Sequence, residues 1–66
     1  MGIEIRKLRK ERGMTQMELS EKSQVPRICI TRYEAGQYKP GIENAKKLAV
    51  ALGVTVDELI GEGEAS

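Results

Sequence analysis

Arg27 and Arg32 are the residues of this 66-residue chain whose type and spacing best suit a recognition chemistry. A helix over Pro26–Ala35 would carry both arginines on its polar side. The guanidinium group is a fork of donors that bonds guanine O6 and N7 together. Ordinary solvated charge on a helix surface is the alternative explanation. The pattern therefore raises the hypothesis of a base-reading helix, which depends on the elements around it.

Residues 15–36 supply the elements that would position these arginines. Thr15 and Glu18 fit a capping box, in which the hydroxyl accepts from one backbone N–H and the carboxylate reaches back to the other. A tight turn and a second helix closed by Gly36 follow. A capped helix, a turn and a helix with a basic polar side form the layout of a helix-turn-helix.

The rest of the chain also predicts helices. A first helix ends near Arg12, Ile42–Leu52 forms a fourth helix, and Thr55 opens a fifth with a second capping box to Glu58. No stretch alternates with the period of a strand, so the predicted fold is all-α, a compact five-helix bundle. The predicted core consists of Ile5, Leu8, Met14, Leu19, Val25, Ile30, Tyr33, Leu48, Ala49, Leu52, Val54 and Leu59.

Composition excludes several function classes. One cysteine and no histidine exclude a zinc finger, a histidine-based triad and an internal disulfide. The sequence shows no nucleophile–base pair and no metal-ligand cluster, so we expect no enzyme, no metal and no cofactor. No apolar run approaches the ~20 residues of a membrane span, and no signal peptide is present. We expect a cytoplasmic protein with no membrane partner, built as one domain over 1–60 and a flexible acidic tail over 61–66.

The net charge of +1 hides an uneven distribution. Residues 1–40 carry nine Lys and Arg against five Glu, a net +4, whereas residues 41–66 carry two Lys against five Asp and Glu, a net −3. Such a polarity would orient the first part of the chain toward a polyanion such as DNA.

Several motifs occur in the order and spacing typical of the Cro and lambda-repressor-like (XRE-type) helix-turn-helix family, which the chain resembles over about residues 1–60. The motifs are Ile5-Arg6-Lys7-Leu8-Arg9, Arg12-Gly13-Met14-Thr15-Gln16, Glu18-Leu19, Ile30-x-Arg32-Tyr33-Glu34-x-Gly36, Lys39-Pro40, Glu43-Asn44 and Leu52-Gly53-Val54-Thr55-Val56-Asp57-Glu58-Leu59. The resemblance implies a lambda-repressor-like bundle that binds double-stranded operator DNA as a symmetric dimer, with the helix-turn-helix at its second and third helices.

Positions carried over from the resemblance assign a role to individual residues. The base-reading positions are Arg27, Ile28, Thr31 and Arg32. Ile28 either packs on a thymine methyl or covers the helix flank. Gln16 is expected to contact a phosphate at a helix N-terminus, where N–H groups favour anions, or else is a surface helix former. Lys39 falls in a loop that touches the DNA backbone, and Arg9 and Glu34 match a buried or half-buried ion pair that ties the first helix to the third.

Some residues depart from the family pattern. Gln24 stands at a turn position that commonly holds a glycine in the left-handed conformation. This conformation costs a non-glycine residue about 1 kcal/mol. Ser20 and Ser23 predict thinner packing between the two helices, and Pro26 supplies no capping oxygen. Cys29 is either a small, partly buried residue or a redox switch. These departures concern the turn and leave the predicted fold unchanged.

The expected function is that of a sequence-specific DNA-binding transcriptional regulator that acts as a homodimer on a palindromic operator. Of repression and activation, repression is the expected activity. Val56, Leu59 and Ile60 are the expected dimer interface, because they offer more apolar surface than one short helix buries in its own bundle. The alternative is a protein-interaction module, such as an antitoxin that binds a partner toxin, with DNA binding secondary.

Overall fold

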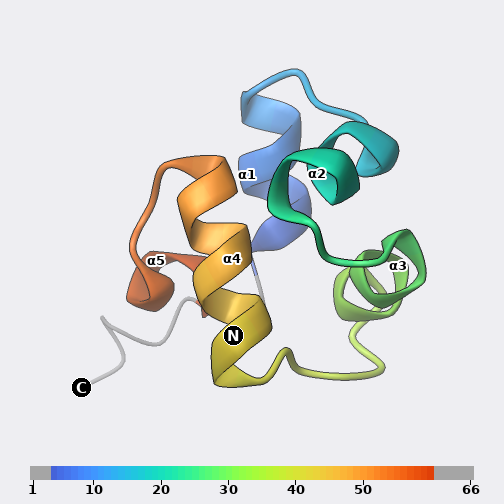
Figure 1. Cartoon of the computed structure of the whole chain (residues 1–66), viewed down its shortest axis with the longest axis vertical. Helices are drawn as coiled ribbons and strands as arrows, with labels where there is room; N and C mark the ends of the chain where they lie inside the picture. The colour runs from blue at the N-terminus through green and yellow to red at the C-terminus, as the bar shows by residue number, and fades with distance from the viewer. Residues whose placement is uncertain (1–3, 61–66) are drawn as a thin grey trace.

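The computed structural model describes residues 4–60, so the predicted tail over 61–66 lies outside the described residues. Five helices make up the described part: α1 (Ile5–Glu11), α2 (Gln16–Ser23), α3 (Arg27–Glu34), α4 (Ile42–Leu52) and α5 (Val56–Ile60) (Figure 1). No strand occurs between residues 4 and 60. The predicted all-α fold of five helices is confirmed.

Two helices begin at the predicted capping boxes. The Thr15 hydroxyl accepts from the Glu18 N–H at 3.0 Å, and the Thr15 N–H donates to the Glu18 carboxylate at 2.8 Å. Thr55 and Glu58 repeat the arrangement at 3.1 and 2.9 Å. Each box satisfies two backbone N–H groups that a helix start would otherwise leave without a partner. The starts of α2 and α5 are therefore set by local sequence.

The turn between α2 and α3 is closed by side chains that the sequence suggested would weaken it. Gln24 takes the left-handed conformation expected of it, with φ of 64°. The Ser20 hydroxyl donates to the Val25 carbonyl at 2.7 Å, and the Ser23 hydroxyl accepts from the Val25 N–H at 3.2 Å. Both backbone groups of Val25 are thus bonded by the two serines. These bonds offset part of the cost of ~1–2 kcal/mol at Gln24.

The core lies around α4, which contacts α1, α2 and α5, while α2 also packs on α3. The residues with the largest fully buried side chains are Ile5, Leu19, Val25, Ile30, Leu48, Leu52 and Leu59. Leu8, Met14 and Val54, which were predicted as core, are only partly buried and pack against it. Ala51, which was not predicted, is buried. Each fully buried Leu, Ile or Val side chain stabilises the fold by about 1.5–3 kcal/mol, so these few residues hold the bundle together.

Two contacts link the ends of distant helices. The Arg12 guanidinium donates to the Leu52 carbonyl at 2.5 Å, where α4 ends before the left-handed Gly53. A cation at a helix C-terminus meets both an unpaired carbonyl and the negative end of the helix dipole. The Glu4 N–H donates to the Leu59 carbonyl at 2.8 Å and joins α5 to the start of α1. Together these contacts hold α1 in the position from which it supports α3.

Candidate nucleic-acid interface

The four residues predicted to read bases lie on the exposed side of α3. Arg27, Ile28, Thr31 and Arg32 are all exposed, whereas Ile30 and Tyr33 of the same helix are buried. We call these four exposed residues the reading face. Tyr33 also accepts a hydrogen bond on its hydroxyl from Asn44 of α4 at 2.9 Å, which supplies the partner expected for it. The helix is therefore anchored on one side and free to meet a ligand on the other.

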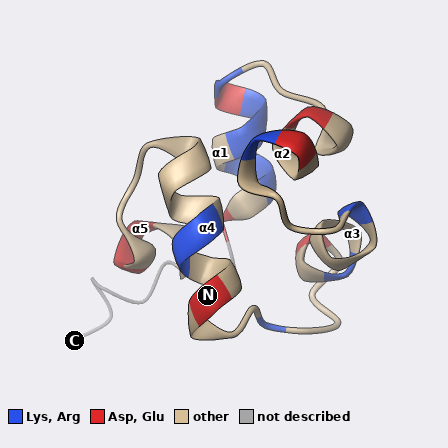
Figure 2. Cartoon of the chain, viewed as in Figure 1, with Lys and Arg blue, Asp and Glu red and all other residues tan. Residues whose placement is uncertain are grey.

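Charge on the described residues favours an anionic ligand on this side. Between residues 4 and 40, nine Lys and Arg stand against five Glu, whereas residues 41–60 carry two Lys against three acidic residues. Figure 2 shows both signs of charge on α1 to α4, with Lys and Arg predominating on α1 and α3, and only acidic residues on α5. The predicted polarity is present, although part of the predicted negative charge belongs to residues 61–66.

Tyr38, which was not among the residues predicted from the sequence, lies beside the reading face. The guanidinium carbon of Arg32 lies 5.5 Å from the centroid of the Tyr38 ring, within the range of a cation–π contact. Tyr38 lies in the loop after α3 and is 57% exposed. The ring holds the end of a long side chain on the reading face. An exposed aromatic residue shortly after the helix-closing Gly36 was the signal available in the sequence.

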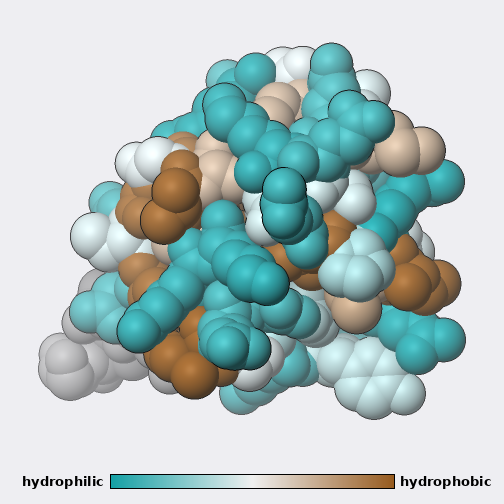
Figure 3. Space-filling view, viewed as in Figure 1, coloured by the Kyte–Doolittle hydropathy of each residue, from teal (hydrophilic) through white to brown (hydrophobic). Residues whose placement is uncertain are grey.

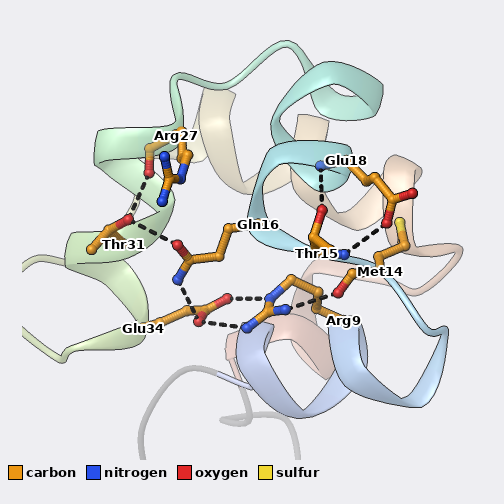
Figure 4. Close-up of polar contacts among 8 residues, drawn as sticks. All are labelled: Arg9, Met14, Thr15, Gln16, Glu18, Arg27, Thr31 and Glu34. Atoms are coloured by element: carbon orange, nitrogen blue, oxygen red, sulfur yellow. Dashed lines mark hydrogen bonds and ion pairs between the residues drawn. The ribbon is translucent and has the colours of Figure 1, made fainter.

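The predicted ion pair between Arg9 and Glu34 is confirmed and buried. The Arg9 Nε and Nη2 atoms donate to the two Glu34 carboxylate oxygens at 2.8 and 3.1 Å, and the Nη1 atom donates to the Met14 carbonyl at 2.8 Å. The side chains are 10% and 6% exposed. A bidentate arginine–carboxylate pair is short, strong and directional. It joins α1 and the segment before α2 to the end of α3 (Figure 4).

Both charges of this pair are stabilised in the folded chain. Burial raises the pKa of Glu34, but hydrogen bonds from Arg9 and Gln16 and the charge of Arg9 outweigh it, so the pKa lies below its ordinary value. The hydrogen bond to Glu34 raises the pKa of Arg9, against a smaller effect of burial. Glu34 is therefore ionised at neutral pH and acts only as an acceptor.

Gln16 links the ion pair to the reading face. Its side-chain nitrogen donates to Glu34 at 3.0 Å, and its side-chain oxygen accepts from the Thr31 hydroxyl at 3.2 Å. Figure 4 shows the Gln16 side chain between α2 and α3 with these bonds on either side. Lys39, the other predicted phosphate contact, lies exposed in the loop between α3 and α4. The structure thus gives Gln16 an internal role in addition to the one predicted for it.

Comparison with known proteins decides the family. The family profile described as helix-turn-helix matches residues 5–59, which include nearly all of the described chain. The chain belongs to the helix-turn-helix family. This confirms the family and the lambda-repressor-like fold that the sequence resemblance indicated.

Relatives within the helix-turn-helix family include named regulators. The chain is 36% identical over 62 residues to the immunity repressor protein of Bacillus phage phi105, covering 94% of this chain and 43% of that protein. It is 37% identical over 60 residues to the CTXphi repressor RstR of Vibrio cholerae, covering 91% and 54%. It is 33% identical over 60 residues to the transcriptional activator BcrR of Enterococcus faecalis, covering 91% and 29%. The chain therefore spans only part of the length of these three relatives.

One part of the predicted dimer surface needs correction. Leu59 is fully buried in the chain's own core, so its side chain has no surface to offer a second subunit. Val56 and Ile60 are partly exposed, although Val56 also packs against the core. The sequence argument had placed Leu59 both in the core and on the dimer surface, and its burial supports only the core assignment. Of the three predicted residues, two retain exposed surface.

The described residues hold neither a metal-ligand cluster nor a membrane span. No group of three or more Cys, Asp or Glu side chains between residues 4 and 60 is arranged to hold a metal ion. Within the same range, no helix is long and apolar enough to cross a bilayer. Cys29 is a partly buried free thiol, as one of its two interpretations proposed.

Proposed function

We propose that this chain is a sequence-specific DNA-binding transcriptional regulator in which α3 enters the major groove. The observation that carries the proposal is the reading face, whose residues are exposed on α3 while Ile30 and Tyr33, on the opposite side of the helix, are buried in the core. Arg27 and Arg32 supply donors suited to guanine, and Ile28 offers a methyl-bearing surface suited to thymine. A major groove ~12 Å wide admits a helix presented in this way.

Backbone contacts would fix the register of the protein on the duplex. We assign Gln16 to a phosphate because it stands at the start of α2, where N–H groups and the helix dipole favour an anion. Lys39 is assigned to a second phosphate because its loop adjoins the end of α3. Such contacts position a protein without conveying sequence, and they make its affinity depend on salt.

The proposal includes a homodimer on a palindromic operator. Two copies related by a two-fold axis read two half-sites whose centres are about 34–36 Å apart, one turn of DNA. Val56 and Ile60, on α5, are the proposed apolar contacts between the copies. The acidic α5 lies away from α3 in Figure 1, which leaves both reading faces accessible in such a dimer.

We propose that the chain represses transcription rather than activating it. Two of the three relatives described above are named repressors, and the third is named an activator. Occupation of an operator by a bound protein is by itself enough to repress transcription. The proposal places the protein in the cytoplasm with its DNA and assigns it no catalytic step.

A protein-interaction module is the second candidate, and one observation favours it. Ile42 and Val50 of α4 are 66% and 81% exposed, eight residues apart on one helix face. In Figure 3 the visible face is mostly polar, with separate apolar patches. A partner such as a toxin would bury these residues and leave the reading face unused.

Selection from a random duplex library separates the two candidates. The DNA-binding proposal predicts an enriched motif made of two inverted half-sites. Replacement of Ile42 and Val50 by Ser should leave that motif unchanged, because neither residue lies on α2 or α3. Failure of the wild-type chain to enrich any motif would overturn the proposal in favour of the protein-interaction module.

A further inference from the structure

The hydrogen bonds that run from Arg9 to Thr31 have a defined direction. Arg9 has only donors, and the ionised Glu34 carboxylate has only acceptors. Arg9 occupies both Glu34 oxygens, and Gln16 shares one of them at 3.0 Å. Whatever else contacts the Glu34 carboxylate must therefore donate to it.

This requirement orients the Gln16 amide. The amide has a donor end and an acceptor end. Because Glu34 accepts, the nitrogen of Gln16 faces it, and the oxygen of Gln16 faces Thr31 at 3.2 Å. The orientation of the Gln16 amide is thus imposed by the buried Glu34 carboxylate, to which it donates directly.

The Thr31 hydroxyl can only accept hydrogen bonds from a ligand outside the protein. Its hydroxyl has a single hydrogen and two lone pairs. The two protein groups within reach are the Gln16 side-chain oxygen at 3.2 Å and the Arg27 backbone carbonyl at 3.1 Å, and both only accept. The hydroxyl hydrogen of Thr31 is therefore donated to a protein group, whichever of these two acceptors it bonds. The exposed Thr31 oxygen presents only lone pairs to the groove.

We propose that Thr31 is a specificity-determining residue that accepts a hydrogen bond from the exocyclic amino group of adenine or cytosine. In the major groove these amino groups, N6 of adenine and N4 of cytosine, are the only donors. This inference rests on the proposed function, since it applies to α3 lying in the major groove. A threonine hydroxyl in general pairs with either a donor or an acceptor on a base edge. The inference restricts the partners of Thr31 to base edges that carry a donor.

The neighbouring residues give the reading face an alternating polarity. Arg27 lies one helical turn before Thr31, and Arg32 follows it directly. Both guanidinium groups can only donate hydrogen bonds, so their partners on the bases are acceptors, namely guanine O6 and N7 or thymine O4. Thr31 places an acceptor between them. A duplex with base acceptors at all three positions would leave the Thr31 oxygen unpaired.

Base analogues test the direction of this hydrogen bond. The starting duplex is the one recovered by selection, and the tested position is the one at which Thr31→Val changes base preference most. The adenine or cytosine there is replaced by purine or 2-pyrimidinone, each of which lacks the amino group. Wild-type chain should lose about 2- to 10-fold in affinity, the range expected of one net hydrogen bond. Thr31→Val should bind both duplexes equally, and Thr31→Ser should respond as the wild type does.

A 7-deaza purine at the same base pair, which lacks the N7 acceptor, provides the opposite test. If the wild-type chain is sensitive to the 7-deaza purine and Thr31→Val is not, Thr31 donates and the inference is overturned. Equal sensitivity of both proteins to the amino-lacking duplex also overturns it, because Thr31 then reads no base there. Thermal unfolding of Thr31→Val verifies that the variant is folded. These outcomes leave the proposed function standing, whereas the absence of any selected duplex overturns the proposed function itself.

Discussion

Arg9 and Glu34 join the first helix to the end of α3 by hydrogen bonds of 2.8 and 3.1 Å, and their side chains are only 10% and 6% exposed. The orientation of the proposed recognition helix therefore depends on a buried ionic contact with a helix that carries none of the reading face. We therefore expect both the stability of the fold and the proposed DNA reading to depend on this pair.

Removal of one partner of the pair should destabilise the fold strongly. Arg9→Met leaves the Glu34 carboxylate buried without its main donor, and such losses cost about 3–5 kcal/mol. Urea denaturation measures the free energy of unfolding. Lys10→Met is the matched control, because Lys10 is an exposed residue of the same helix and should change stability by less than about 0.5 kcal/mol. Equal effects of the two substitutions would contradict a buried pair.

The pair should also give stability a specific dependence on pH. The pKa of Glu34 in the folded chain lies below its ordinary value of 4.5, so its contribution is present above that value and is lost as pH falls through the lower, folded pKa. Urea midpoints measured from neutral to acidic pH should fall more steeply for the wild type than for Glu34→Gln below about pH 4.5. Parallel curves for the two proteins would show that Glu34 does not carry this dependence.

Substitution of a reading-face arginine should alter base preference at a single position. Arg27→Ala removes a fork of donors suited to guanine, so the preference at one base pair of each half-site should relax by about 1–3 kcal/mol. Affinities for a set of duplexes that vary at each position measure this effect.

Lys39→Ala is the comparison for this experiment, since Lys39 is assigned to a phosphate. It should weaken binding to all duplexes similarly and reduce the salt slope by about 1. A uniform loss with Arg27→Ala, equal across all duplexes, would assign Arg27 to the backbone instead.

Tyr38 should assist recognition through Arg32. The ring holds the guanidinium at 5.5 Å, and an exposed cation–π contact contributes about 0.5–1 kcal/mol. Tyr38→Ala should therefore weaken binding about 2- to 5-fold, with the loss confined to the base pair that depends on Arg32. Tyr38→Phe keeps the ring and should bind as the wild type does. If Tyr38→Phe loses as much as Tyr38→Ala, the hydroxyl rather than the ring makes the contact.

Local signals were sufficient to predict most of the fold. The capping boxes at Thr15 and Thr55 are formed within four residues of sequence, and the structure contains both. Gln24 was predicted to be left-handed from its place in the turn and is so. The apolar stripe of Ile42–Leu52 predicted a helix with those bounds. In each case the determining contacts lie close together in the chain.

Contacts between distant segments account for what the sequence did not show. Leu59 was assigned both to the core and to a dimer surface, and only the packing of α5 against the core decides between the two. Tyr38 meets Arg32 only through the path of the loop after α3. The direction of the bond from Thr31 to Gln16 depends on the Glu34 carboxylate, whose charge Arg9 of α1 stabilises. Periodicity and capping rules contain no information on such relationships.

The ratio of affinities for the selected duplex and a scrambled duplex tests the central claim most directly. At physiological salt, a sequence-specific regulator binds its operator about 10³-fold or more tightly than other DNA. We predict a ratio of at least that order for the wild-type chain, and a ratio lowered toward one when Arg27 and Arg32 are both replaced by Ala. A wild-type ratio near one would contradict sequence-specific reading by α3.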